Sequence, residues 1–272
     1  KPVIVATQML HSMIEIIDFY NFNDLHGKLE DGDSHPGVDE ITAYLEDRMN
    51  IDEHTVFLSS GDMWQGGSSS NSTKGKIVTD WMNYLGFEAM ALGNHEFDWG
   101  TDAIRENVDI ADFSILAINI YDNATGERAD YCEPSVMIER GGVKIGIIGA
   151  IGNCHSSIAK DKNKDFNFKT GSALTNLVKA ESEKLRDEGA DVIVYLLHSD
   201  GDDYDLLLSS GDYVDVVFEG HTHQAYATTD AYGVPHVQDG GDNKHAMSHV
   251  ELEVNFANGN IKVNTKRYIP HT

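Results

Sequence analysis

Positive charge is scarce in this sequence. Its 272 residues include 20 Lys and Arg against 45 Asp and Glu, which gives a formal net charge of −25 at pH 7. A nucleic-acid backbone and an anionic membrane surface are both negatively charged, so neither is a suitable partner for such a protein. We therefore expect no nucleic-acid duplex as a partner. The simplest consequence of the acidity is good solubility in a salty or extracellular medium.

Cysteine, proline and long apolar runs are also rare. The two cysteines, Cys132 and Cys154, form no CxxC motif, and the sequence leaves open whether they pair in a disulfide. No apolar run approaches the ~20 residues of a membrane-spanning helix, so we expect no membrane insertion. With 40% hydrophobic residues and only 5 prolines, the chain can bury a sizeable core and should be globular.

Segments with strand and helix patterns alternate over about the first 220 residues, and short strands and turns dominate after that. The expected strands are residues 14–22, 55–60, 88–92, 114–120, 143–151, 191–197 and 213–218. The expected helices are residues 38–49, 76–85, 102–110 and 174–188. Asn258 and Gly259 form the pair typical of a tight hairpin turn. Since no repeat, linker or boundary is visible, we expect one α/β domain with mixed sheets over residues 1–272.

Side chains able to bind metal follow five of these apolar runs, each on the loop that leaves the C-terminal end of the run. The loops contain NDLHG, SGDMWQGG, GNHEFD, LLHSDG and EGHTH. Sites in open α/β sheets collect at the carboxyl ends of the strands, so we expect these loops to converge. The candidate side chains are Asp24, His26, Asp62, Asn94, His95, Asp98, His198, His221 and His223.

The mixture of imidazole and carboxylate donors fits Zn, Mn, Fe or Co, whereas an all-oxygen set would indicate Mg or Ca. Seven of the candidates, all except His95 and Asp98, are too many for one tetrahedral zinc ion. Two divalent metal ions that share a bridging carboxylate would use all seven. A single GD turn or a single buried His is usually only structural, so the prediction rests on the five loops together.

The motifs D-x-H, GD, GNH, H and GH-x-H, in this order, resemble the calcineurin-like metallophosphoesterase superfamily. More closely, NFNDLHG, GDMWQGG followed by Asn71, and GNHEFDWG resemble the catalytic domain of the 5′-nucleotidase / 2′,3′-cyclic-nucleotide phosphodiesterase family, over residues 14–267. Serine/threonine protein phosphatases have Arg soon after GD and directly after GNHE, where this chain has residues 63–67 and Phe97. The resemblance implies a four-layer α/β/β/α sandwich of two mixed sheets, with a dimetal site at the sheet edges.

The resemblance also implies a role for each candidate. The first ion would be bound by Asp24, His26 and His223, and the second by Asn94, His198 and His221. Asp62 would bridge the two ions, His95 would be the catalytic histidine, and Asp98 would hold the His95 ring. Asn71 and Asn94 resemble substrate-binding positions. His155, in the loop after residues 143–151, is a further candidate for the pocket, with a plain loop as the alternative. We interpret Glu96 as structural, hydrogen-bonding to backbone near the site.

These roles predict metal-dependent hydrolysis of small phosphate esters. Two cations lower the pKa of a shared water, and the resulting metal-bound hydroxide attacks phosphorus in line with the leaving alkoxide. Protonated His95 would stabilise the transition state or donate its proton to the leaving group. The cations would also supply the positive charge that this acidic chain lacks. The alternative is a non-catalytic metal- or partner-binding module on the same fold, which would not need His95 and Asp98.

The substrate and the location follow from the resemblance alone. Relatives of the 5′-nucleotidase type usually carry a C-terminal domain that holds the base, and this chain ends at Thr272, where that domain would be linked. We therefore expect either a piece of a longer nucleotidase or a stand-alone domain with broader phosphomonoesterase or phosphodiesterase activity. The resemblance favours an extracytoplasmic location, either secreted, periplasmic or cell-surface. The start KPVIVATQML suits a processed chain and a cytosolic one equally.

Overall fold

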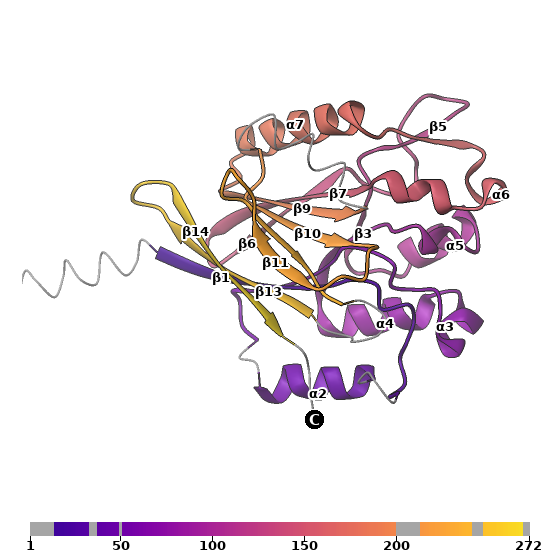
Figure 1. The fold of residues 1–272 in the computed structure, drawn as a ribbon, viewed down its shortest axis with the longest axis horizontal. Helices are drawn as coiled ribbons and strands as arrows, with labels where there is room; N and C mark the ends of the chain where they lie inside the picture. The colour runs from indigo at the N-terminus through magenta and orange to yellow at the C-terminus, as the bar shows by residue number, and fades with distance from the viewer. Residues whose placement is uncertain (1–13, 33–36, 49–50, 200–212, 241–246, 269–272) are drawn as a thin grey trace, which may run out of the picture.

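Two six-stranded sheets face each other in the computed structural model, and helices cover the outer face of each sheet (Figure 1). Helix α7 (Ser172–Asp187) lies over one sheet, and α2 (Val38–Arg48) and α4 (Lys76–Leu85) lie under the other. This arrangement is the predicted four-layer α/β/β/α sandwich of mixed sheets. The structure describes residues 14–32, 37–48, 51–199, 213–240 and 247–268.

The first sheet contains the N-terminal strands and the C-terminal hairpin. In spatial order its strands are β14 (Asn260–Tyr268), β13 (Met247–Asn255), β1 (Ile14–Phe22), β2 (Thr55–Ser59), β3 (Phe87–Ala91) and β4 (Ser114–Leu116). β1 to β4 are parallel, whereas β13 is antiparallel to both of its neighbours. Because β1, β2 and β3 are parallel, the loops that follow them leave from the same edge of the sheet.

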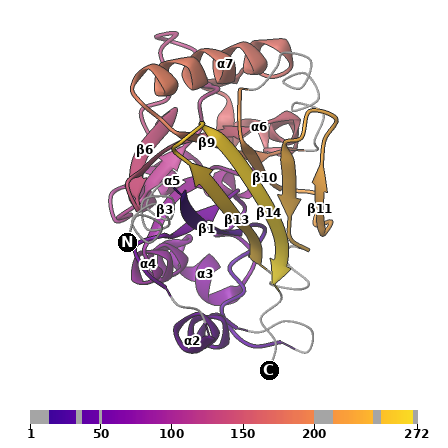
Figure 2. The same cartoon turned by 90° about the vertical axis from the view of Figure 1, so that its left-hand side faces the viewer.

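The second sheet is formed by the middle of the chain. In spatial order its strands are β11 (Tyr226–Thr229), β12 (Pro235–Gln238), β10 (Val216–Gly220), β9 (Val192–His198), β7 (Val143–Ile151) and β6 (Ser135–Arg140). The four inner strands are parallel and the two edge strands are antiparallel. Figure 2 shows the sandwich turned by 90°, with the long strands of the β13–β14 hairpin between α7 and α2.

Alternation along β1 shows how its sequence builds two layers at once. Ile17 and Phe19 point into the core between the sheets, where Phe19 lies 6.4 Å from Phe218, measured between ring centroids. Tyr20 and Phe22 join the core between the first sheet and its helices. A strand places successive side chains on opposite faces, so the odd and even positions of this run serve different cores.

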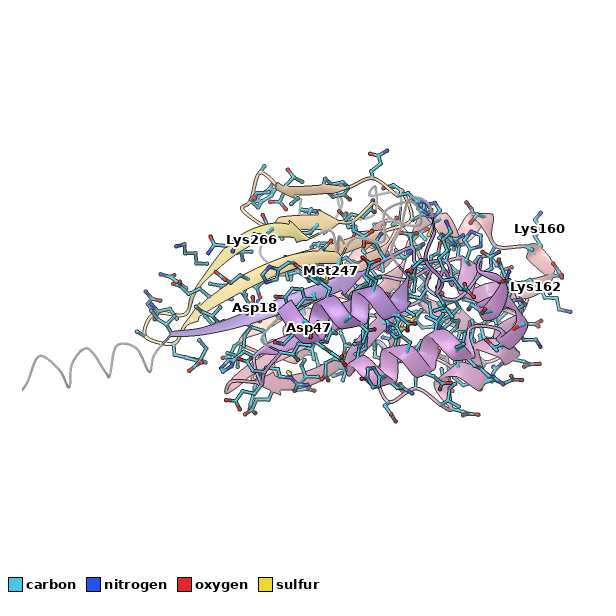
Figure 3. The ribbon with its side chains drawn as sticks, turned by 90° about the horizontal axis from the view of Figure 1, so that it is seen from below. Asp18, Asp47, Lys160, Lys162, Met247 and Lys266 are labelled. Atoms are coloured by element: carbon cyan, nitrogen blue, oxygen red, sulfur yellow. The ribbon has the colours of Figure 1, made fainter. Side chains whose placement is uncertain are left out.

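Shorter elements lie mainly at the end of the sandwich where the parallel strands finish. They are α3 (Ser68–Thr73), α5 (Thr101–Val108), α6 (Lys160–Asn163), and a two-stranded sheet of β5 (Ile120–Asp122) and β8 (Phe166–Phe168). In Figure 3 the labelled Lys160 and Lys162 mark α6 at the end of the molecule opposite to the extended β13–β14 hairpin. None of the helices in the described ranges has the length and apolarity that a membrane crossing requires.

The expected strand over residues 114–120 is divided in the structure. β4 ends at Leu116, and the backbone of Ala117 and Ile118 bonds instead to Glu133 and Gly149. Asn119 stabilises this change of backbone partners, because its side chain donates to the carbonyl oxygens of Ile151 (2.6 Å) and Lys169 (3.0 Å). The apolar run was correctly recognised, but tertiary contacts move its second half out of the first sheet.

Candidate metal centre

Residues at or just beyond the C-terminal ends of several parallel strands lie close together at the carboxyl edge of the two sheets. The backbone N–H of Asp24 donates to Gly61 O (2.9 Å), and that of His26 donates to Asp62 O (3.0 Å). The two sheets are joined by His198 on β9, whose ring Nδ1 lies 2.7 Å from Ser60 O, just beyond β2. Six of the predicted ligands fall into groups whose donor atoms lie within 4.8 Å of one another. The groups are Asp24, His26 and His223; Asp24, Asp62 and His198; and His198, His221 and Cys154.

The first group presents two imidazoles and a carboxylate to one point. His26 Nδ1 lies 3.0 Å from the carbonyl oxygen of Gln65. If Nδ1 carries the ring proton and donates it to this oxygen, the lone pair of the ring lies on Nε2 and is available to a metal ion. That Nε2 lies 3.3 Å from Nε2 of His223, which is 3.2 Å from Asp24 Oδ1. Three donor atoms facing one another at such distances suit a cation between them.

The second group contains buried polar atoms whose bonding is incomplete. His198 is fully buried; its Nδ1 bonds to Ser60, and its Nε2 lies 3.1 Å from Asp62 Oδ2. This His198–Asp62 contact is an ion pair without an aligned hydrogen bond, and Asn94 Oδ1, in the loop after β3, has no hydrogen-bond partner among the described residues. A buried polar atom without a partner is costly and needs an explanation. Both atoms belong to predicted ligands, so the residues present fit a divalent ion of the Zn, Mn, Fe or Co class.

Backbone conformation distinguishes the same residues. Six non-glycine residues in the described ranges have positive φ, and five of them are predicted ligands: Asp24 (51°), His26 (50°), Asp62 (56°), His221 (85°) and His223 (55°). Each such conformation costs about 1–3 kcal/mol and persists where the surrounding structure enforces it. Strain of this kind gathers at functional sites, and no sequence pattern had indicated it.

Asp62 interacts electrostatically with residues of both groups. Burial alone would raise the pKa of Asp62, but the charges of His198, His26 and His95 outweigh it and hold that pKa well below its usual range. Burial alone would lower the pKa of His198, but the charge of Asp62 outweighs it and raises that pKa. His198 belongs to one group and His26 to the other. The Asp62 carboxylate therefore interacts with a residue of each group, and its role as a shared metal ligand stays a prediction.

Glu96 holds the Asp62 loop, in agreement with its interpretation as a structural residue. Its Oε2 accepts the backbone N–H groups of Asp62 (2.9 Å) and Gly93 (2.7 Å). Its Oε1 accepts those of Met63 (2.9 Å) and Trp64 (3.2 Å). Burial, followed by the negative charge of Asp62, raises the pKa of Glu96 to about 7. The four N–H donors oppose this rise without cancelling it, and through them the buried side chain holds the loop after β2 to the loop after β3.

His95 begins the short helix η1 (His95–Phe97) beside the first group. Its backbone N–H donates to Asp62 Oδ1 (2.8 Å), and its ring lies 5.1 Å from the His26 ring, between centroids. Ring Nδ1 lies 2.9 Å from Asp98 Oδ2, as predicted for the pair. Burial lowers the pKa of His95, but the charge of Asp62 and the bond to Asp98 outweigh it, so the pKa is raised. The half-exposed ring can therefore carry a proton on Nε2 toward a bound molecule.

The side chains of the two other candidate substrate-binding residues contact other parts of the protein. The exposed Asn71, on α3, accepts from Gly66 N (2.9 Å) and donates to Gly66 O (3.1 Å). The ring of His155, in the short helix η2 (Asn153–Ser157), stacks on Phe168 at 5.0 Å between centroids. Their contact with substrate stays a prediction.

Cys154 is the residue of this site that the sequence did not indicate. Its buried side chain lies among the donors of His198 and His221, and it forms no disulfide with Cys132. The loop after β7 reaches the end of β9 because Gly152 N–H donates to His198 O (2.8 Å). A single cysteine without a metal-binding spacing gave no signal for this position.

Gly93 gives a direct test of how Asp62 is positioned. A Cβ at this position would overlap Asp62 Oδ1 and crowd its backbone nitrogen. We expect Gly93→Ala to displace the carboxylate and to weaken metal binding by about 10–100-fold, as loss of a supporting contact does. Isothermal titration with Zn²⁺ or Mn²⁺ measures the effect. As a control, Gly233→Ala strains a backbone at φ +86° with open space around it, and should lower Tm without changing metal affinity. Unchanged affinity in Gly93→Ala would contradict this role.

His236, on β12 next to β10, contacts two carboxylates away from the metal-binding candidates. We expect these contacts to make the free energy of unfolding depend on pH. His236 Nδ1 lies 3.4 Å from Glu219 Oε1, and Nε2 lies 3.1 Å from Asp230 Oδ2. Burial lowers the pKa of His236, but Glu219 and Asp230 outweigh it and raise the pKa above the ordinary 6.5. Between 6.5 and the raised pKa, the folded state holds a proton that the unfolded state has lost. We expect this stabilisation to be complete below that window and lost as the pH rises through it.

Urea unfolding at a series of pH values measures this effect, with His236→Gln as the variant. The wild type should lose unfolding free energy across the window relative to the variant, which cannot titrate there. Two profiles that run parallel would show that His236 contributes nothing to the pH dependence.

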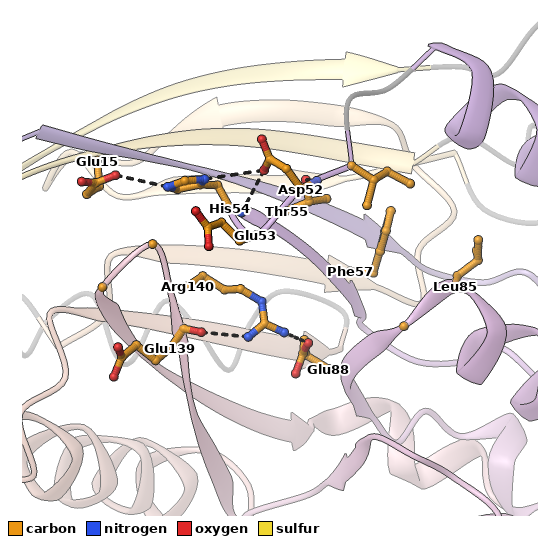
Figure 4. Close-up of a pocket in the computed structure, with 14 residues that line it drawn as sticks. Glu15, Asp52, Glu53, His54, Thr55, Phe57, Leu85, Glu88, Glu139 and Arg140 are labelled. Atoms are coloured by element: carbon orange, nitrogen blue, oxygen red, sulfur yellow. Dashed lines mark hydrogen bonds and ion pairs between the residues drawn. The ribbon is translucent and has the colours of Figure 1, made fainter.

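A large cleft elsewhere in the molecule is separate from these groups. It encloses about 880 Å³ at the edge where the parallel strands begin, and contains none of the predicted site residues (Figure 4). His54 lies between Glu15 and Asp52, and Arg140 pairs with Glu88. The two basic side chains of this cleft are therefore both paired with carboxylates.

The chain is similar in sequence to known phosphoesterases. The sequence model for calcineurin-like phosphoesterases matches residues 18–225. An apyrase from Tabanus yao is 32% identical over 248 residues, covering 83% of this chain and 44% of the apyrase. A snake venom 5′-nucleotidase from Gloydius brevicauda is 29% identical over 214 residues, covering 74% of this chain and 36% of that protein. The chain thus spans less than half the length of these two curated relatives.

One solved structure matches this chain over nearly the full length of both chains. The calcineurin-like phosphoesterase YfkN from Bacillus subtilis has a TM-score of 0.79 at 20% identity, covering 94% of this chain and 91% of that one. This likeness establishes the fold. The match to the family model covers more than half of the sequence and includes all nine predicted metal-binding and catalytic residues. The chain belongs to the calcineurin-like phosphoesterase family.

Proposed function

We propose that residues 1–272 form one catalytic domain of a dimetal phosphoesterase that hydrolyses nucleotides or related phosphate esters. The observation that carries this proposal is the convergence of six predicted donors in groups whose atoms lie within 4.8 Å of one another. Relatives named apyrase and 5′-nucleotidase support nucleotides as the substrate class.

The family implies divalent metal ions, and the two groups suggest how two would be shared. Asp24, His26 and His223 would hold the first ion. Asn94, His198 and His221 would hold the second, and Asp62 would contact both. When bound, the two ions activate a water molecule near neutral pH and neutralise the phosphate oxygens.

His95 supplies the proton in this scheme. Its Nδ1 is held by Asp98, which fixes the ring and leaves Nε2 to face the ester. Nε2–H stabilises the oxygen that leaves phosphorus and then transfers its proton to it. The backbone N–H of His95 is bonded to Asp62. This bond fixes the proton donor relative to the carboxylate that would contact both ions.

The alternative is a binding module that retains the fold and the metals but not the activity. The paired His95 and Asp98 favour the enzyme, because metal binding alone requires neither. We further propose an extracytoplasmic location, which a relative named as a snake venom enzyme supports.

Hydrolysis by the metal-stripped protein tests the proposal, after separate restoration with Mn²⁺, Zn²⁺, Co²⁺ and Mg²⁺. The substrates are 5′-AMP, 2′,3′-cyclic AMP, a bis-aryl phosphate and an aryl monophosphate. We expect turnover that depends on added metal, and the ranking of the substrates identifies the ester class. Two bound ions without turnover of any substrate would overturn the enzyme in favour of the binding module.

A further inference from the structure

Cys154 lies at the carboxyl edge, where the proposed second ion would bind. Its side chain is 2% exposed and lies in η2, directly after β7. The sulfur and one ring nitrogen each of His198 and His221 lie within 4.8 Å of one another. This places the thiol in the same group as two predicted ligands of the second ion, although about 44 residues separate it from His198 in the sequence.

A second observation points to a ligand at this position. His198 is fully buried, and its Nε2 faces Asp62 Oδ2 at 3.1 Å as an ion pair without an aligned hydrogen bond. Asn94 Oδ1, from another loop of the same proposed ion, is buried and has no hydrogen-bond partner among the described residues. The incomplete bonding at His198 therefore involves a donor of the same group as the thiol, independently of the cysteine itself.

We propose that Cys154 is an additional donor to the second ion and that its sulfur biases this position toward zinc or cobalt. The inference rests on the proposed dimetal function. Zinc binds imidazole nitrogen at about 2.0–2.1 Å and cysteine sulfur at about 2.3 Å, so a nitrogen and a sulfur that subtend an angle of about 110° at one ion lie about 3.5 Å apart. The observed group needs to contract by no more than about 1.3 Å to reach that geometry.

Coordination changes the bonding of the thiol in a defined way. Without an ion, the S–H group donates to the carbonyl oxygen of His198, with Sγ 3.1 Å from it. On coordination the S–H bond breaks, its proton passes to solvent, and the thiolate donates an electron pair to the ion. No oxidant or reductant takes part. Because thiolate is a soft donor, the position should prefer Zn²⁺ or Co²⁺ over Mg²⁺.

Electronic absorption of the Co²⁺-loaded protein tests this proposal, since a sulfur ligand to Co²⁺ produces a near-ultraviolet charge-transfer band. The wild type is compared with Cys154→Ser and with Cys132→Ser, the matched change at the second cysteine. The number of bound Co²⁺ ions is measured on the same samples. We expect the band in the wild type and in Cys132→Ser, and its loss in Cys154→Ser.

The other outcomes overturn the proposal in distinguishable ways. Two bound Co²⁺ ions without a sulfur band in the wild type would make Cys154 only a structural hydrogen-bond donor, and the proposed function would stand. A band that persists in Cys154→Ser would assign the sulfur to another residue. No bound Co²⁺ would contradict the dimetal function together with this inference.

Discussion

His95→Ala is expected to lower kcat by about 100- to 10,000-fold, the usual contribution of a positioned general acid. Both metal ions should stay bound, because the side chain of His95 is not among the proposed ligands. Its ring is instead tied to Asp98 at 2.9 Å, and only its backbone N–H bonds to Asp62. The measurement is kcat on the best substrate of the ester panel, together with metal content.

The matched control is His54→Ala. His54 is also partly buried and faces a carboxylate, with Nε2 3.2 Å from Glu15 Oε2, but it lies in the cleft at the opposite edge of the sheets. The kcat of His54→Ala should equal that of the wild type. Asp98→Asn keeps an acceptor for His95 and removes the charge, so an intermediate loss is expected. If His95→Ala and His54→Ala had equal kcat values, His95 would not be the proton donor.

Glu96→Gln is expected to lower the free energy of unfolding by about 2–6 kcal/mol. The carboxylate accepts four backbone N–H groups, two at each oxygen. In glutamine one oxygen becomes an NH₂ group, which leaves two buried N–H donors without an acceptor, at a cost of about 1–3 kcal/mol each. Since whole domains are stable by only about 5–15 kcal/mol, the loss should be plain in urea unfolding.

Glu181→Gln provides the comparison at another buried glutamate. Glu181 Oε1 accepts from the Ser135 hydroxyl (2.6 Å) and from Lys184 (2.9 Å). A glutamine carbonyl can still accept from both, so the loss should be clearly smaller than at Glu96. Equal losses at the two positions would show that the backbone clamp adds nothing beyond ordinary burial of a glutamate.

Much of the fold was predictable because its strands and amphipathic helices have clear periods. β1, β7 and α4 begin and end where the pattern predicts. α3 was missed because its sequence, SSSNST, has neither an apolar face nor strong helix formers. It is held by tertiary contacts, such as the hydroxyl of Ser70 donating to Trp64 O.

The site was predictable where one loop carried several polar ligands after an apolar run, as in GNHEFD and EGHTH. The sequence could not indicate the positive φ of the ligands, which arises from backbone bonds between loops such as Asp24 to Gly61. Nor could it indicate Cys154, because its neighbourhood with His198 exists only through the pairing of β7 with β9. Contacts of this kind depend on sheet order, which a local pattern does not encode.

Anomalous diffraction from crystals loaded with Zn²⁺ or Mn²⁺ tests the dimetal centre most directly. We expect two peaks about 3.5–4 Å apart on either side of the Asp62 carboxylate. One peak should contact Asp24, His26 and His223, and the other Asn94, His198 and His221. A single peak, or two peaks away from Asp62, would contradict the proposed dimetal centre.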